Sequence, residues 1–210
     1  MSPRNLCVVA LLLGLAGQAR ADDRYYMLLF TSQGEPKLPR NSHTFAAFVR
    51  TSPDHSRVEG YCISWMPRSL AIEPTRLHPV DGKNLTLAET FQWIRSIGAR
   101  VTLRGPYPIR KELYDLAGRQ ADRLNRGDLR YILLDRRYRG SDASNCIHAV
   151  CDLDVNRPPL TTGANFGDDS GEPLVEHFRR HFVPAAEPTR WLTDRLNITP
   201  KEVRFAALTP

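Results

Sequence analysis

The chain has 210 residues, of which 29 are Lys or Arg and 23 are Asp or Glu, so its net charge is +6. This length suffices for one domain with a buried core. The basic excess is carried almost entirely by arginine, but no aromatic-interleaved basic stripe or nucleic-acid motif accompanies it. The composition therefore argues against a DNA- or RNA-binding protein.

The first 21 residues have the pattern of a cleavable secretory signal. A basic start at Arg4 and an apolar run over residues 6–17 precede Ala-Arg-Ala and Asp22. The run is too short to span a bilayer, and no later segment approaches a membrane span. We therefore expect residues 1–21 to be removed, and residues 22–210 to form a single globular domain that is secreted or periplasmic and has no integral membrane segment.

The N-terminal third of this domain predicts strands. Residues 25–31 are apolar and aromatic, which is typical of a buried strand. Residues 43–51 and 57–66 follow as two strands that a short turn joins into an antiparallel hairpin. A further strand is expected over residues 72–79, before a loop at 81–82.

Helices mixed with strands are expected after this point. Thr86 and Glu89 have the spacing of a capping box, and apolar residues at helical spacing continue the helix to Gly98. Strands followed by mixed helices and strands favour an α+β fold with a mainly antiparallel sheet and packed helices. The remaining elements are expected to be a strand at 101–103, a break at 105–108, a helix at 109–124, a strand at 129–134, a helix beginning near Cys146, a helix at 173–182, and an irregular tail from about 183 with one short helix near Trp191.

Cys146 lies at the start of one of these predicted helices. Asp142, Ser144 and Asn145 precede it and are residue types that cap the free N–H groups of a helix start. The partial positive charge of a helix start favours the thiolate, so this position suits a nucleophile. The alternative is a small buried cysteine in an amphipathic helix, because the apolar residues that follow it also require a core.

Three cysteines remain after removal of the signal: Cys62, Cys146 and Cys151. An odd number leaves at least one thiol unpaired within the chain. Cys146 and Cys151 would point about 140° apart on one helix, so we do not expect them to pair. A bridge between Cys62 and Cys151 would leave Cys146 free, and the sequence leaves this pairing open.

A thiol nucleophile needs a base, usually a histidine. His43 begins a predicted strand, whereas His55 lies in the hairpin turn, roughly 25 Å along the strand at about 3.3 Å per residue. The hairpin register places residue 65 opposite His43, within one or two positions, and Ser64 is the nearest polar side chain. We therefore expect Cys146, His43 and Ser64 to form a catalytic site.

The other histidines fit this chemistry less well. His148 points about 200° away from Cys146 on the predicted helix. His177 and His181 are four residues apart, as in metal sites, but two ligands make no site and the zinc-protease order is absent. We expect this pair on a solvated helix face. Cys146, His148 and Cys151 lack the spacing of common zinc knuckles, so neither a metal nor another cofactor is expected.

The order of these elements resembles that of the circularly permuted papain-like enzymes. A strand that begins with His43 is followed about a hundred residues later by Asn145-Cys146 at a helix start. The group includes permuted NlpC-type cell-wall amidases and lecithin retinol acyltransferase-like proteins. The resemblance implies a permuted papain-like fold, with Cys146 as nucleophile, His43 as base and a polar residue, for which we choose Ser64, on the adjacent strand. The acyltransferase-like members usually carry a second histidine there, where this chain has none.

The same resemblance implies an exported cysteine hydrolase or acyltransferase that acts on an amide or ester carbonyl of a cell-wall peptide or a lipid acyl group. A non-catalytic alternative is an exported protein of the same fold that binds an anionic cell-envelope polymer through arginines, such as those at 136–139 or Arg179 and Arg180. Such clusters also fit solvated surface charge. A buried Cys146 with His43 more than about 6 Å from its sulfur would favour the non-catalytic alternative.

Overall fold

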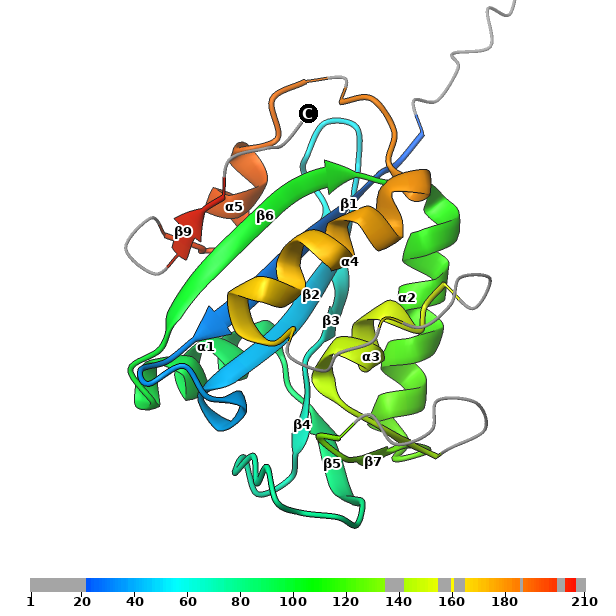
Figure 1. Ribbon diagram of the computed structural model, residues 1–210. Helices are drawn as coiled ribbons and strands as arrows, with labels where there is room; N and C mark the ends of the chain where they lie inside the picture. Colours follow the sequence, from blue (N-terminus) through cyan, green and yellow to red (C-terminus); the bar gives the residue numbers. More distant parts are fainter. Residues whose placement is uncertain are drawn as a thin grey trace, which may run out of the picture.

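A computed structural model describes residues 22–134, 142–154, 160, 165–185, 187–199 and 203–206. Its centre is a five-stranded sheet (Figure 1). All neighbouring strands are antiparallel except β6 and β9, which confirms the α+β class with a mainly antiparallel sheet. In spatial order the strands are β3 (Val58–Ile63), β2 (Ser42–Thr51), β1 (Arg24–Gln33), β6 (Arg100–Pro108) and β9 (Val203–Phe205).

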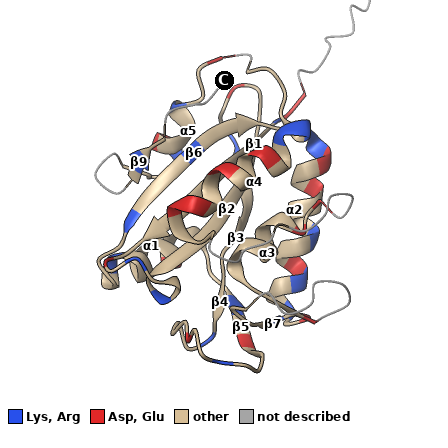
Figure 2. Ribbon diagram, in the orientation of Figure 1, with Lys and Arg blue, Asp and Glu red and all other residues tan. Residues whose placement is uncertain are grey.

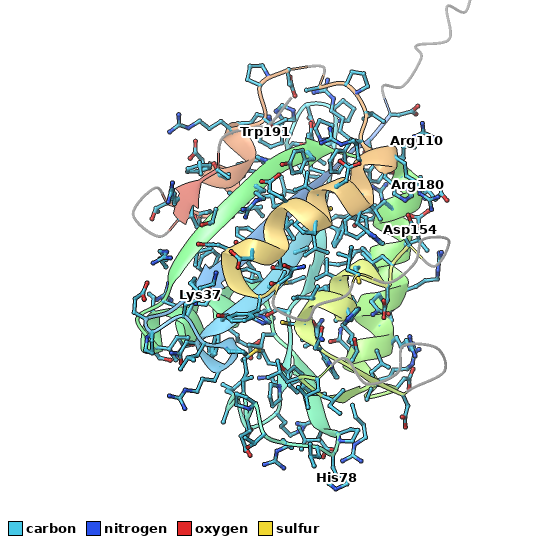
Figure 3. The ribbon with its side chains drawn as sticks, viewed as in Figure 1. Lys37, His78, Arg110, Asp154, Arg180 and Trp191 are labelled. Atoms are coloured by element: carbon cyan, nitrogen blue, oxygen red, sulfur yellow. The ribbon has the colours of Figure 1, made fainter. Side chains whose placement is uncertain are left out.

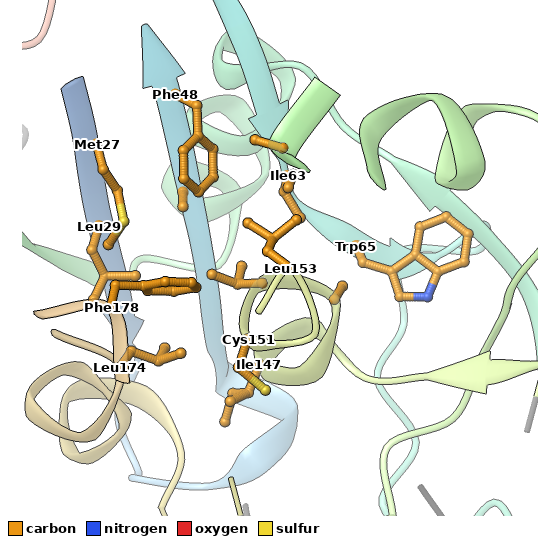
Figure 4. Close-up of a cluster of buried hydrophobic side chains, with 14 of the residues drawn as sticks. Met27, Leu29, Phe48, Ile63, Trp65, Ile147, Cys151, Leu153, Leu174 and Phe178 are labelled. Atoms are coloured by element: carbon orange, nitrogen blue, oxygen red, sulfur yellow. The ribbon is translucent and has the colours of Figure 1, made fainter. Parts of the chain in front are cut away.

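Both faces of this sheet are covered because its central strand is apolar on both sides. Met27 and Leu29 of β1 point into one cluster of buried side chains, whereas Leu28 and Phe30 point into another. The first core is drawn in Figure 4 and the second lies on the opposite face. The first core packs against α2 (Lys111–Asn125), α3 (Cys146–Cys151) and α4 (Gly171–Phe178), and the second against α1 (Leu87–Ser96) and α5 (Trp191–Arg195).

A smaller sheet extends below the first one in Figure 1. The predicted strand at 72–79 is wrong, because the strand begins at Val80 and includes the predicted loop at 81–82. A Cβ atom at Gly82 would lie 1.9 Å from Cζ2 of Trp65, so this glycine makes room for the indole ring instead of forming a turn. In spatial order the strands are β4 (Trp65–Pro67), β5 (Val80–Asn84), β7 (Arg130–Tyr131) and β8 (Ala143–Ser144).

The predicted hairpin of β2 and β3 is confirmed, with Ala46 opposite Ile63. The predicted single strand at 57–66 is interrupted at Ser64, after which the chain enters the smaller sheet. The side chain of Asn84 bridges this interruption, because its Oδ1 accepts from the Ser64 N–H at 2.8 Å and its Nδ2 donates to the Cys62 carbonyl at 2.9 Å.

The capping box of α1 is confirmed. The Thr86 hydroxyl accepts from the Glu89 N–H at 3.2 Å, and the Glu89 carboxylate accepts from the Thr86 N–H at 2.8 Å. The helix predicted at 109–124 is confirmed as α2.

Two other predictions in this half of the chain are wrong. The expected break at 105–108 lies within β6, where Gly105 adopts a φ of 95° beside a bulge in the pairing with β1. Its positive φ is one that a glycine adopts without steric cost, so the strand turns locally and continues. The expected strand at 129–134 pairs only over Arg130–Tyr131.

The C-terminal part contributes more to the fold than the expected irregular tail. Leu192 and Ile198 are buried in the second core, and Val203 begins β9 at the sheet edge. Short helices and edge strands of this kind carry little periodic signal. Within the part of the chain that the structure describes, no helix combines the length and apolarity needed to cross a membrane. The predicted signal at 1–21 lies outside the described residues.

Candidate functional site

A cavity of about 420 Å³ lies where the start of β2 meets the start of α3. Among the described lining residues there is no Lys, Arg, Asp or Glu, and leucine, proline and phenylalanine side chains form much of the wall. Both His43 and Cys146 line this cavity, although they are about a hundred positions apart in the sequence. The lining residues are Pro39, Ser42, His43, Thr44, Pro74, Leu133, Leu134, Asn145, Cys146, Ile147, Asn165, Phe166 and Gly167.

Cys146 is the first residue of α3, and Asn145 is its cap. Oδ1 of Asn145 accepts from the His148 N–H at 2.9 Å, while its Nδ2 donates to the Leu133 carbonyl at 3.3 Å. The cap therefore ties the helix start to the segment of Leu133, which also lines the cavity. This local geometry explains why Cys146 borders the cavity.

The residue Cys146 is 7% exposed, and burial raises the pKa of its thiol to about 11. Hydrogen bonds from the backbone of Thr44, Ile147 and Cys146 itself oppose this shift and lower the pKa by a smaller amount. The helix start therefore favours the thiolate as expected, but the cost of burying a charge is larger, and the net shift of the pKa is upward. At neutral pH this group is a thiol.

His43 is almost fully buried at the start of β2. Its ring stacks on Phe45 at 5.5 Å between centroids and meets the edge of Trp93 at 5.7 Å. Burial lowers the pKa of His43 to about 3, so the imidazole is neutral across the neutral pH range. Its Nε2 lies 2.8 Å from the Ser64 hydroxyl, the polar neighbour that the hairpin register indicates. Its Nδ1 has no hydrogen-bond partner among the described residues.

Thr90 lies behind Ser64 and was not singled out from the sequence. Its hydroxyl is 2.8 Å from the Ser64 hydroxyl and 2.8 Å from the Thr86 carbonyl. The one signal for it is its position one helical turn after the capping residue Thr86. A line of hydroxyl groups therefore links the imidazole of His43 to the first turn of α1.

Cys146 and His43 do not hydrogen-bond to each other within the described structure. The backbone of Thr44, next to His43, contacts the sulfur, which shows that the two elements meet. Strand alternation, however, turns the imidazole toward the second core, whereas Cys146 belongs to the first core. The two side chains border the same cavity from opposite faces of the sheet.

A buried tyrosine also lies near the sulfur. Burial raises the pKa of Tyr131 well above its usual value, and the negative charge of a Cys146 thiolate would raise it further. Its hydroxyl has no hydrogen-bond partner among the described residues. The sequence identified this residue only as part of a strand, so its proximity to Cys146 was missed.

The remaining histidines lie outside the cavity. His55, in the hairpin turn, stacks on Trp191 with 3.7 Å between ring centroids. The expectation of a solvated helix face for His177 and His181 is wrong, because both are buried where α4 and the turn after it pack against the domain. Nε2 of His177 lies 3.0 Å from the Cys151 carbonyl, and Nε2 of His181 lies 3.2 Å from the Asp154 carboxylate.

The arginines that the structure describes at the end of α4 are paired with acids. Arg179 contacts Glu176 at 2.5 Å, and Arg180 contacts Asp154. Arg180 and Asp154 are labelled in Figure 3. Acidic and basic segments also alternate along α2 (Figure 2). The other predicted cluster, at 136–139, lies outside the described residues. Arg179 and Arg180 would therefore have to give up acidic partners to bind an anion.

The cysteines Cys62, Cys146 and Cys151 are all free thiols, so the expectation that Cys146 and Cys151 do not pair is confirmed. Comparison with models of known protein families, with characterised proteins and with solved structures finds no match to this chain.

Proposed function

We propose that this protein is an exported cysteine hydrolase or acyltransferase with a permuted papain-like fold, acting on an amide or ester carbonyl. The observation that carries the proposal is that Cys146 and the neutral, buried His43 border one uncharged cavity. The cavity has the size of a small-molecule site. The free Nδ1 of His43 supplies the proton acceptor that a thiol nucleophile requires.

The reaction would begin with a neutral Cys146 thiol and a neutral His43 imidazole. A substrate carbonyl enters the cavity, and the sulfur of Cys146 attacks the carbonyl carbon as the thiol proton passes to Nδ1 of His43. Because the imidazole is packed on the other face of the sheet, this transfer requires the His43 side chain to turn around the start of β2 toward Cys146 when substrate binds. Collapse of the tetrahedral intermediate breaks the bond to the amine or alcohol, which takes the proton from the imidazolium. Water then hydrolyses the thioester with His43 again as base. Catalytic hydrogen bonds often form only when substrate is bound, so their absence in the free protein is compatible with this sequence.

Ser64 would act as a positioning residue for His43. When Nε2–H donates to the Ser64 hydroxyl, the lone pair of the imidazole is on Nδ1, where the thiol proton must go. Thr90 holds the Ser64 hydroxyl from behind at 2.8 Å. This tautomer requires the single proton of the Thr90 hydroxyl to go to the Thr86 carbonyl, 2.8 Å away, so that the Ser64 hydroxyl accepts from Nε2–H and donates to Thr90.

The chemical character of the cavity wall indicates which substrates would fit. Its apolar residues include Leu133, Leu134 and Phe166, and no charged side chain is present among the described lining residues. Placing a charged group there would cost desolvation energy without a counter-ion. Of the carbonyl substrates considered, an uncharged acyl or peptide segment fits best.

The non-catalytic alternative has one observation in its favour. Cys146 is buried with a raised pKa and does not hydrogen-bond to His43. Anion binding through arginines, its positive claim, is opposed by the acidic partners of Arg179 and Arg180. A cysteine that never forms an acyl intermediate would favour this alternative.

The test is to capture the thioester. The protein is incubated with p-nitrophenyl acetate and p-nitrophenyl octanoate, quenched in acid, and digested for mass spectrometry. We expect an acyl group on the peptide that carries Cys146, removable with hydroxylamine, while Cys62 and Cys151 serve as internal controls. Acylation at all three thiols at equal rates, or no acylation and no ester hydrolysis above the buffer rate, would overturn the proposal.

Substituting Ser64 by alanine is expected to lower kcat by about tenfold to a hundredfold, because the imidazole loses the group that fixes its tautomer. The imidazole ¹⁵N spectrum of His43 should change from one tautomer to a mixture. The exposed Ser69, replaced by alanine, serves as the matched control. An unchanged ¹⁵N spectrum with unchanged kcat would show that Ser64 does not position His43.

A further inference from the structure

The C-terminal end of α3 gathers three metal-ligating groups that the proposed reaction does not use. Nδ1 of His148 lies 3.4 Å from Sγ of Cys151 and 3.8 Å from Oδ1 of Asp152, and the sulfur lies 3.6 Å from the same oxygen. All three ligand atoms lie within 4.8 Å of one another. We propose that His148, Cys151 and Asp152 bind a zinc ion.

The spacing of these atoms fits a single tetrahedral ion. Zinc binds sulfur at about 2.3 Å and nitrogen or oxygen at about 2.0–2.2 Å, so two of its ligand atoms are roughly 3.3–3.6 Å apart. The three observed separations of 3.4, 3.6 and 3.8 Å lie within about 0.5 Å of this range. Small side-chain rotations would therefore suffice to place all three atoms on one ion.

The helix produces this arrangement directly. Residues i, i+3 and i+4 share one face of an α-helix, and His148, Cys151 and Asp152 have this spacing at the end of α3. The sequence pattern alone does not single out Asp152 as a ligand, because an aspartate at a helix end is ordinarily a solvated residue. Cys146, the third cluster residue considered from the sequence, lies earlier, at the start of α3.

The donor types favour zinc over other common cations. A thiolate with an imidazole suits zinc, whereas calcium and magnesium prefer oxygen ligands alone. The thiolate and the carboxylate together carry two negative charges, which match the charge of the ion. Binding releases the proton of the Cys151 thiol to solvent, as ligation of thiols by zinc requires. His148 and Cys151 already have protein contacts, which the ion would replace.

Burial supports a site that is closed on one side and open on the other. His148 and Cys151 are each 1% exposed, whereas the Asp152 side chain is 35% exposed. Three protein ligands leave one tetrahedral position for a water molecule, which can approach past the carboxylate. The ion would join the last turn of a six-residue helix whose first residue is Cys146. The inference does not depend on whether Cys146 is a nucleophile.

The experiment measures metal bound to the full chain. Protein purified with zinc in all buffers and then desalted is analysed by atomic emission spectrometry, and we expect one zinc per chain. Cobalt(II) should replace the zinc and give a thiolate-to-cobalt charge-transfer band in the near ultraviolet. Cys151→Ser should abolish this band, whereas Cys62→Ser and Cys146→Ser should retain it.

Asp152→Asn provides the decisive variant if the buried substitutions prevent folding, because Asp152 lies at the surface. We expect this variant to keep the circular dichroism spectrum of the wild type and to bind zinc at least tenfold more weakly in competition with a chelating dye. Zinc below one-tenth equivalent in the wild type, or wild-type affinity in Asp152→Asn, would overturn the proposal. Acylation of Cys146 is measured separately, so failure of the zinc site and failure of the proposed reaction give different results.

Discussion

Replacing Cys146 by alanine is expected to reduce kcat for p-nitrophenyl esters by about a thousandfold or more. The remaining rate should be that of direct attack by water on the bound ester. The proposed reaction passes through a thioester on this sulfur, and no second cysteine is present in the cavity wall described here. The hydroxyls of Ser42 and Thr44 in the same wall are weaker nucleophiles and are engaged with Leu38 and Ser170. Removing one buried sulfur atom should cost about 1–2 kcal/mol of stability, so the protein should still fold. The effect is measured as the ratio of the initial rates of wild type and variant at saturating ester concentration.

Cys62 provides the matched control for this substitution. It is also a free thiol whose pKa burial raises, to about 12, but it lies on β3 and lines a different cavity. Cys62→Ala should therefore retain more than half of the wild-type rate. A similar loss in both variants would indicate damage to the fold, and full activity of Cys146→Ala would exclude this cysteine as the nucleophile.

The fold could be predicted where the sequence carries a local pattern. The apolar run of β1, the hairpin and the capping box of α1 each depend on residues close together in the chain. The strand containing Gly82 could not be predicted, because the reason for this glycine is the ring of Trp65, which the chain brings there only on folding. Likewise, the interruption at Ser64 depends on a side chain twenty positions away, that of Asn84.

Some features of the candidate site could likewise be predicted from the sequence, and others could not. The neighbourhood of His43 and Ser64 follows from the hairpin register, which is a local property. The protonation states of His43 and Cys146 could not be predicted from the sequence. Burial shifts the pKa values of both groups, and only the tertiary structure determines which side chains are buried. The same reason explains why His177, at helical spacing from His181 in a polar segment, was expected in solvent and is buried instead.

Replacing Phe178 by alanine is expected to lower the free energy of unfolding by about 3–5 kcal/mol, the cost of removing a buried aromatic side chain and leaving a cavity. Phe178 is 0% exposed and lies in the first core beside Leu29, with Leu174 of the same helix next to it (Figure 4). It therefore holds the end of α4 against the sheet. Urea unfolding monitored by circular dichroism measures the effect, as a lower midpoint with an unchanged m value.

Phe205 is the control, because this residue is 38% exposed on the edge strand β9. Phe205→Ala should cost less than about 1 kcal/mol. A loss below about 1 kcal/mol for Phe178→Ala as well would mean that α4 is not docked on the sheet as described.

The 3-10 turn Gly167–Ser170 leads into α4, and its first residue lines the cavity with Phe166. A docked α4 therefore supports the part of the cavity wall formed by Phe166 and Gly167, and KM for the ester should rise in Phe178→Ala even under conditions where the variant stays folded.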